Sequence, residues 1–431
     1  MGSAWIPTIL LFGMTLHARA RSGSWFAPSA FIGLVWCFFI SASLLGVDRT
    51  VPALGIWVIV ALVLSIQLGS AVAEGGSSAS ARARPDETLL VHWLPLRIRS
   101  VCFLMVLIAS AGCVYFVRES MERFGLSLTV TDLVQMAARW TLERYDEIAE
   151  PLSLRFTAIW LYPGALLGGM LFSLSKKPLD RALGLFSLLP TLIYSLLTGG
   201  RASFLVGLAC WLGGYWSSRH AQTRGGLKLF TAKIGASVLV LMAGLFLLFL
   251  VVNSFRGYSS SKDLYLEVDS GQVRNYMLGS PAAFADWIAH TDYSSLHWGG
   301  YTFAGLYNLL GIQQRILGDY KDSARTSGLE GTNVFTAFRG LIQDFTFPGA
   351  LFICGAWGLF SGYAYSKKSF HPWSLLGLSA FYAVGLFSPL YCLFRFNGAI
   401  FAWVVSWFVL RPMKEGTAFS LRAKSQLVQA S

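Results

Sequence analysis

Long apolar stretches recur along the whole chain. A helix needs about 20 mostly apolar residues to cross a bilayer, so these stretches predict transmembrane helices. They are continuous rather than alternating, which argues against a transmembrane β-barrel. The composition agrees, because 55% of the residues are hydrophobic and 13% are charged, whereas a water-soluble domain carries about 25% charged residues. We therefore expect an all-α polytopic membrane protein.

Eleven stretches qualify as candidate spans. They cover residues 4–16, 26–46, 53–73, 98–117, 153–174, 182–198, 203–217, 234–254, 346–365, 374–392 and 398–410. This assignment divides the chain into three regions. Helices one to eight occupy 1–254, a large loop occupies 255–345, and helices nine to eleven with a tail occupy 346–431.

Lysine and arginine gather in the short loops that follow odd-numbered spans, for example Arg19 and Arg21, or Lys176 and Lys177. Such loops stay in the cytoplasm, so the N-terminus and the loops after even-numbered spans are expected to face outward. Acidic residues are distributed the other way. All 22 lie in outward segments except Glu74, Asp86, Glu87, Asp180 and Glu415.

Several functional classes lack their sequence signals. The six cysteines fall inside apolar stretches without the spacing of a metal site, so neither disulfides nor metal are expected. The net charge of +12 is not concentrated in a basic block with interleaved aromatics, so no nucleic-acid partner is expected. The chain has no Walker, GxGxxG, GxSxG or HExxH motif, and no cofactor is expected.

Two outward segments are long. Residues 118–151 contain Thr129 and Asp132 at the spacing of a capping box. Leu133, Met136 and Trp140 then share one helical face. This pattern predicts a helix lying along the outer membrane–water boundary. Ordinary packing within the loop explains the same apolar residues equally well.

The second segment, 255–345, is too long for a plain connection, and loops of this length are usually functional. It is rich in Tyr, Trp and Phe, Tyr301 among them, and its charges nearly cancel. Aromatic faces beside carboxylates and amides suit sugar rings, which offer both C–H faces and hydroxyls. The alternatives are a small core within the loop or an aromatic belt at the lipid interface.

Arg201 stands between two apolar helices in the stretch Thr198-Gly199-Gly200-Arg201. An arginine at membrane depth is costly and marks a functional site by default. It stays protonated, so it must hold an anion or lie in a wet cavity. The paired glycines allow a tight turn and the close approach of a ligand. The alternative is an arginine that extends from a helix end to a lipid headgroup.

Three more arginines lie near outer span ends: Arg256, Arg339 and Arg395. Short outward loops disfavour arginine, so Arg201 and Arg395 need an explanation. The planar guanidinium matches phosphate oxygens. We therefore expect the set to bind a lipid-linked diphosphate at the outer leaflet. For each arginine alone, a headgroup or an aspartate partner is an equal alternative.

A general base is harder to place. The outward histidines are His290 and His297. Asp344 directly precedes the ninth span, which puts a carboxylate at the membrane surface, close in sequence to Arg339. A salt bridge between Asp344 and Arg339 is the structural alternative.

These residues resemble the Wzy-type oligosaccharide repeat-unit polymerases, which are the O-antigen polymerases of bacterial inner membranes. The resemblance rests on the order and topology of four short stretches and covers nearly the whole chain. They are Phe26-Ala27-Pro28; Thr198-Gly199-Gly200-Arg201; 276–284 with 298–303; and 332–339 with 344–349.

The resemblance implies a GT-C-type glycosyltransferase of the bacterial inner membrane that works on the periplasmic face without nucleotide or metal. Donor and acceptor would both be undecaprenyl-diphosphate-linked oligosaccharides, and membrane lipid and a chain-length regulator protein would be further partners. Arg201, Arg256 and Arg339 take the diphosphate role, Arg274 and Arg315 a second-lipid or saccharide role, and Asp344 the role of base or orienter.

Related O-antigen ligases carry His-Asn where this chain has Thr332-Asn333, the histidine being their proposed base. Thr332 argues against a ligase, which would transfer the glycan to lipid A core. A lipid-linked oligosaccharide transporter is the alternative from another class. It predicts charges spread through the membrane interior, whereas here they cluster at outer span ends.

Overall fold

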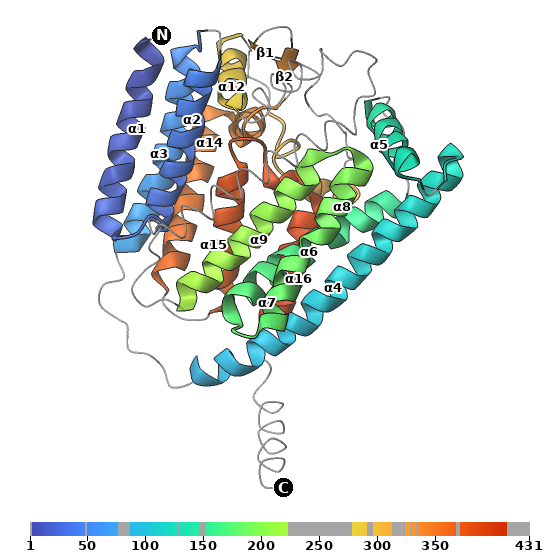
Figure 1. The fold of residues 1–431 in the computed structure, drawn as a ribbon. Helices are drawn as coiled ribbons and strands as arrows, with labels where there is room; N and C mark the ends of the chain where they lie inside the picture. Colours follow the sequence, from blue (N-terminus) through green and yellow to red (C-terminus); the bar gives the residue numbers. More distant parts are fainter. Residues whose placement is uncertain are drawn as a thin grey trace.

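In the computed structural model, the described part of the chain is built mainly of helices (Figure 1). The described residues are 2–47, 50–75, 87–127, 129–145, 152–222, 278–290, 296–312, 320, 324–327, 330–332, 334–367 and 371–411. In chain order the elements are α1 (Gly2–Ser22), α2 (Pro28–Gly46), α3 (Ala53–Gly75), α4 (Glu87–Phe124), α5 (Val130–Tyr145), α6 (Leu152–Leu174), α7 (Pro178–Phe186), α8 (Leu189–Thr198), α9 (Arg201–Gln222), α12 (Ser280–His290), α13 (Ala304–Leu309), β1 (Ala324–Ser327), β2 (Glu330–Thr332), α14 (Ala337–Ser366), α15 (Pro372–Phe387), η1 (Leu393–Arg395) and α16 (Asn397–Leu410). β1 and β2 pair antiparallel.

Six helical stretches of the described part are long and apolar enough to cross a membrane. They are Pro28–Gly46, Ala53–Gly75, Leu94–Phe124, Ser153–Leu174, Pro178–Thr198 and Ala337–Ser366. α15 and α16 are shorter apolar helices. The expectation of a helical membrane protein is therefore confirmed. The eighth candidate span, 234–254, lies outside the described residues, so the count of eleven stays a prediction.

Several helices have other boundaries than the expected spans; α4, for example, covers Glu87–Phe124 where 98–117 was expected. Three of these differences lie beside a proline. The span 182–198 is two helices, because Pro190 in the first turn of α8 cannot continue the hydrogen-bond ladder of α7. The span 374–392 ends at Phe387, two residues before Pro389. α14 begins nine residues before the expected 346 and is interrupted at Thr346, two residues before Pro348.

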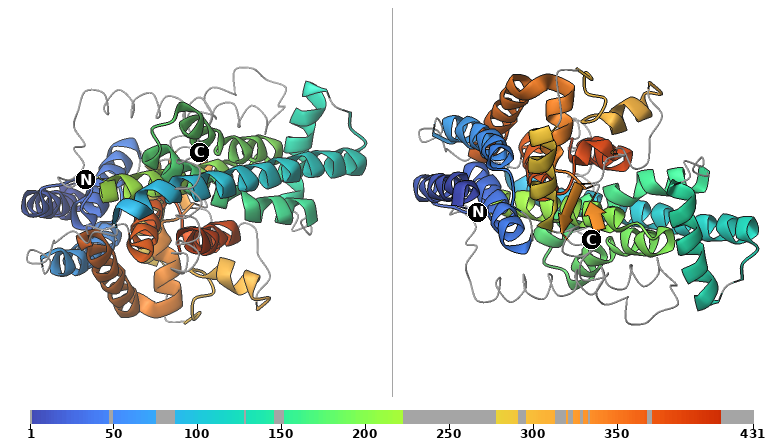
Figure 2. Two further views of the ribbon diagram at one scale, coloured as in Figure 1. Left: turned by 90° about the horizontal axis from the view of Figure 1, so that it is seen from below. Right: turned by 90° about the horizontal axis from the view of Figure 1, so that it is seen from above.

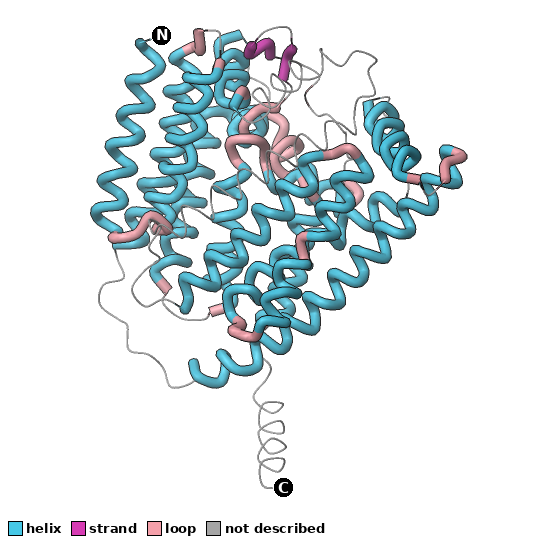
Figure 3. The backbone as a smooth tube through the Cα atoms, viewed as in Figure 1, coloured by secondary structure: helices cyan, strands magenta, loops and turns pink. Residues whose placement is uncertain are grey.

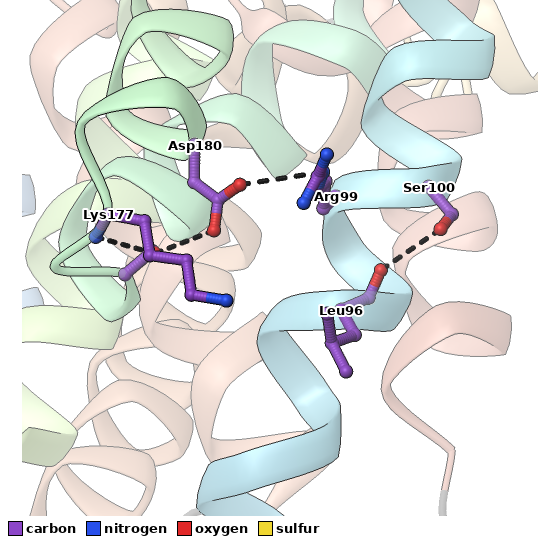
Figure 4. Close-up of polar contacts among 6 residues, drawn as sticks. Leu96, Arg99, Ser100, Lys177 and Asp180 are labelled. Atoms are coloured by element: carbon purple, nitrogen blue, oxygen red, sulfur yellow. Dashed lines mark hydrogen bonds and ion pairs between the residues drawn. The ribbon is translucent and has the colours of Figure 1, made fainter.

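The basic loops meet at one end of the bundle. Arg97 near the start of α4 donates to the carbonyl oxygens of Phe408 and Arg411 at the end of α16, at 2.7 and 2.9 Å. Arg99 forms an ion pair with Asp180 of α7 at 3.5 Å (Figure 4). A nitrogen of the His220 ring, at the end of α9, lies 3.0 Å from the Tyr365 carbonyl of α14. These contacts hold the expected cytoplasmic loops on one side.

α15 joins two buried clusters of the bundle. One cluster is built from α4, α5, α6, α8, α9 and α16, the other from α1, α2, α3, α12 and α14, and α15 contributes to both. Seen along the bundle, these two groups lie side by side (Figure 2). At the end of the bundle opposite the basic loops, which we call the outer end because the sequence predicts that it faces outward, loop segments gather beneath α12 and the two strands (Figure 3).

α5 begins as the capping box predicts. The backbone N–H of Asp132 donates to Thr129 Oγ1 at 3.1 Å, and the Asp132 carboxylate accepts from the hydroxyls of Ser127 and Thr129. These hydrogen bonds lower the pKa of Asp132 from its ordinary value. Met136 and Trp140 are buried, and Trp140 Nε1 donates to Ser120 of α4 at 2.9 Å. Packing on α4 therefore accounts for much of the apolar face of α5.

α3 and α14 pack so closely that glycine is required at their contact. A Cβ atom at Gly358 would lie 2.1 Å from the Ile66 carbonyl oxygen. Ser70 Oγ donates to the Gly358 carbonyl oxygen across the same contact, at 3.0 Å. Small residues that let two backbones approach are the usual basis of helix packing in membranes.

Gly358→Ala is expected to lower the thermal stability of the detergent-solubilised protein by several degrees, because the added methyl forces α3 and α14 apart at a cost of about 1–3 kcal/mol. Gly13→Ala is the matched control, since a Cβ there meets nothing within 4 Å. Equal melting temperatures for the two variants would contradict the packing argument.

Candidate functional site

Two buried arginines meet at one tyrosine ring at the outer end of the bundle. The guanidinium carbon of Arg339, in the first turn of α14, lies 3.8 Å from the Tyr320 ring centre. That of Arg395, in η1, lies 5.6 Å from the same ring. Arg339 is 3% exposed and Arg395 8% exposed. We call Arg339, Arg395, Tyr320 and Tyr301 the guanidinium cluster.

Aromatic rings enclose this cluster. Arg339 also lies over Phe335 and Trp287, at 4.1 and 5.0 Å. Arg395 lies over Tyr391 and Tyr301, at 4.9 and 6.0 Å, and the Tyr301 and Tyr320 rings stack 5.9 Å apart. Rings attract a cation through their negative faces but carry no net charge. The rings therefore add no negative charge of their own beside the two guanidinium groups.

Hydrogen bonds between distant segments bring the two arginines together. The Ala337 N–H at the start of α14 donates to the Ser388 carbonyl after α15, at 2.8 Å. Ser280 Oγ of α12 donates to the neighbouring Pro389 carbonyl at 2.5 Å. Cys392 Sγ lies 3.4 Å from the Thr302 carbonyl. Because α15 ends before Pro389, the segment that leads to Arg395 does not continue that helix. The three contacts above hold this segment against α12, α14 and residue 302.

Asp344 fixes the loop that carries Tyr301. It is fully buried, and its two carboxylate oxygens accept the backbone N–H groups of Tyr301 and Thr302, at 3.1 and 2.6 Å. The His297 N–H donates to the Gln343 carbonyl beside it, at 3.2 Å. We call the joined segments 297–303 and 343–346 the Asp344 clasp. This geometry supports the orienting role of Asp344.

The clasp also contains both non-glycine residues with positive φ in the described part of the chain, Trp298 at 48° and Thr346 at 59°. A β-branched residue such as threonine rarely adopts this conformation, and such strain collects at functional sites. Trp298 is 71% exposed. Its carbonyl accepts the Tyr307 hydroxyl at 2.5 Å. The strained backbone therefore holds a large aromatic side chain at the surface, three residues before Tyr301.

Arg201 is the first residue of α9, after a turn in which Gly199 has a φ of 60°. The Gly200 N–H donates to the Ser195 carbonyl at 3.1 Å, and Ser195 Oγ donates to the Gly200 carbonyl at 2.6 Å. Arg201 is 7% exposed. An arginine that reached out to a lipid headgroup would be exposed, so the structure does not support that alternative.

The turn before Arg201 shares a buried cluster with the segment before Arg395. Leu197 packs in the same core as Leu390 and Leu393. In Figure 1 the junction of α8 and α9 also lies toward the outer end of the bundle. Arg201, Arg339 and Arg395 each have further contacts within the chain.

Tyr320 is the residue of this site that the sequence analysis did not single out. It is an isolated aromatic residue in the charged stretch Asp319-Tyr320-Lys321-Asp322. This isolation is the sequence feature from which its role could have been predicted. Burial raises the pKa of its phenol well above the ordinary value, although Arg339 opposes the shift. The ring is therefore neutral at physiological pH and supplies no negative charge to the arginines.

Other predicted residues are placed differently. Phe284, Trp287 and Phe335 belong to a buried core that they share with α2, α3 and α14, and not to a core of the loop alone. Arg256, Arg274, Arg315 and Asn333 lie outside the described residues. Within the described ranges, no group of three or more His, Cys, Asp or Glu could hold a metal ion.

Comparison with known proteins gave no match. A scan against protein-family models, a search of curated proteins and a search of solved structures each found nothing similar to this chain.

Asp344→Asn is expected to loosen the clasp, because the amide points an N–H₂ group at a backbone N–H and leaves that donor unsatisfied, at a cost of about 1–3 kcal/mol. Hydrogen–deuterium exchange should speed up at Tyr301 and Thr302. The control is Asp286→Asn on α12, whose side chain is 52% exposed. Unchanged exchange in Asp344→Asn would show that the carboxylate does not hold the loop.

Proposed function

We propose that this protein polymerises undecaprenyl-diphosphate-linked oligosaccharide repeat units at the periplasmic face of a bacterial inner membrane. The observation that carries the proposal is the meeting of Arg339 and Arg395 at Tyr320, both buried and both surrounded by rings. Two fixed positive charges at the outer end of a membrane bundle favour a ligand that is anionic and reaches the protein from the lipid phase. A lipid diphosphate has both properties.

The reaction needs little from the protein beyond charge and position. The acceptor sugar hydroxyl attacks the anomeric carbon of the donor glycan, and the bond from that carbon to the diphosphate oxygen breaks. The diphosphate leaves on its lipid with an added negative charge, and the hydroxyl proton passes to a base. Fixed guanidinium groups in a poorly hydrated site stabilise the leaving charge without reorganising.

The aromatic surface beside the cluster supports saccharide binding. Tyr301 belongs to the cluster, and the exposed Trp298 lies three residues before it in the same clasp. A sugar held against Trp298 would have its diphosphate on the side of the arginines. Thr332 is buried, and its hydroxyl accepts the Val334 N–H at 3.1 Å. It therefore stabilises a turn at the position where ligases carry their proposed base, which supports polymerase over ligase.

His297 is the group best placed to take the proton. It is exposed, and its ring centre lies 5.1 Å from that of Tyr301. Asp344, the other candidate, is fully buried with both oxygens engaged by backbone amides. His290 lies on α12, where its Nδ1 contacts Asp286 of its own helix at 3.4 Å. We therefore assign the base to His297 within this proposal and the orienting role to Asp344.

Arg339→Ala and Arg201→Ala are each expected to leave protein levels normal but the glycans at a single repeat unit. The purified variants should extend a synthetic lipid-linked repeat unit about 10²–10³ times more slowly than the parent, the loss typical of one electrostatic group at a developing anion. Arg118→Ala is the matched control, because this arginine lies at the outer end of α4 with its side chain 78% exposed. A normal product ladder from both variants would remove these arginines from the mechanism.

His297→Gln is expected to slow ladder formation by about 10²–10⁴, because the amide cannot accept a proton at the reacting hydroxyl. His290→Gln should behave like the parent. Binding of the lipid-linked substrate should stay unchanged in both variants, which separates a base from a binding residue. The reverse pattern of activities would assign the base to His290.

A further inference from the structure

The short helix α13 exposes a row of large aliphatic side chains beside the guanidinium cluster. Leu306, Leu309, Leu310 and Ile312 are between 38% and 67% exposed, and we call them the α13 ledge. They lie at the outer end of a bundle whose spanning helices also expose apolar residues, including Val404 and Phe408 on α16. Exposed aliphatic residues in such a place mark a contact with lipid or with a partner.

The ledge is directly joined to the segment that carries Arg395. A Cβ atom at Gly305 of α13 would lie 2.6 Å from the Phe394 carbonyl oxygen and 2.9 Å from that of Arg395. Only glycine lets the two backbones come so near. Asn397 at the start of α16 donates a hydrogen bond to the side chain of Asn308. Gly305 and Asn308 thus hold α13 against η1 and α16. The leucines of the ledge lie on its exposed side.

Phe394 joins α13 to α14 and α16 through ring contacts. The Phe394 ring lies 5.9 Å from Phe303, 5.9 Å from Trp357 of α14 and 6.0 Å from Trp403 of α16. Both views in Figure 2 place α13 at the edge of the bundle beside α14 and α16. The ledge therefore faces the surroundings of the bundle, while Arg395 on the neighbouring turn points toward Tyr391 and Tyr320 inside.

We propose that the α13 ledge holds the polyisoprenoid chain of a diphosphate lipid whose headgroup reaches Arg395. The proposal rests on the proposed function for the identity of the headgroup. Two features together select this occupant. One is the exposed apolar surface of the ledge, and the other is the buried guanidinium of Arg395, which lies on the segment that contacts α13 at Gly305. An ordinary membrane lipid would satisfy the ledge alone, whereas a prenyl diphosphate satisfies both.

The test uses the full-length protein in nanodiscs and an undecaprenyl diphosphate that carries a diazirine near the first isoprene units. After illumination, the label is expected on the peptide that contains residues 304–312. Unlabelled undecaprenyl diphosphate should reduce that labelling at least tenfold, and phosphatidylglycerol at the same concentration should not. Equal competition by phosphatidylglycerol, or labelling elsewhere on the protein, would overturn the proposal.

A double substitution, Leu310→Gln with Ile312→Gln, should lower the labelling at least fivefold without unfolding the protein, because both side chains are exposed. Leu45→Gln is the matched control, an exposed leucine near the end of α2. Labelling does not require turnover, so the experiment can refute the polymerase and the ledge independently of each other. A protein that is labelled at the ledge but makes no ladder refutes the polymerase, and one that makes a ladder but is not labelled there refutes the ledge.

Discussion

The two hydrogen bonds to the Asp344 carboxylate organise the outer end of this protein. They tie the turn at Tyr301 and Thr302 to the first part of α14, which also carries Arg339. Because Tyr301 stacks on Tyr320, and Tyr320 lies under both arginines, the position of the guanidinium cluster follows from this clasp. Hydrogen bonds to a buried carboxylate are among the stronger ones in proteins. The strain at Trp298 and Thr346 is maintained by the same contacts.

Burial of two guanidinium groups among rings has an electrostatic consequence. Removing an ion from water costs several kcal/mol even after the protein relaxes. A well-placed ring returns about 2 kcal/mol when the pair is desolvated. Tyr320 contributes no charge, because burial raises its pKa. An anion that enters this environment therefore finds charges that water does not screen. The diphosphate binding that we propose would account for arginines in segments that are expected to face outward.

The candidate site lies where the two halves of the bundle meet. α15 belongs to both buried cores, and the segment that follows it leads through η1 into α16. The contacts between α3 and α14 are close and glycine-dependent, and they fix the part of α14 that follows the break at Thr346. The α13 ledge and Arg395 are joined through the close contact at Gly305.

Residue type and spacing by themselves determined that this chain is a helical membrane protein, and they located most of its spans. Apolar length and charge distribution are local properties, so they can be read from a single segment. The helix breaks at Pro190, Pro389 and Thr346 have proline nearby in the sequence, yet their consequences are not local.

Tertiary structure alone decided that Arg339 and Arg395 share Tyr320, that Asp344 binds backbone amides, and that α13 turns its leucines outward. Each of these contacts joins segments distant in sequence, and none has a repeating pattern that a sequence could display. Tyr320 illustrates the limit. Its neighbours in the chain are charged, and only the folding of α14 and η1 around it makes it the centre of the cluster.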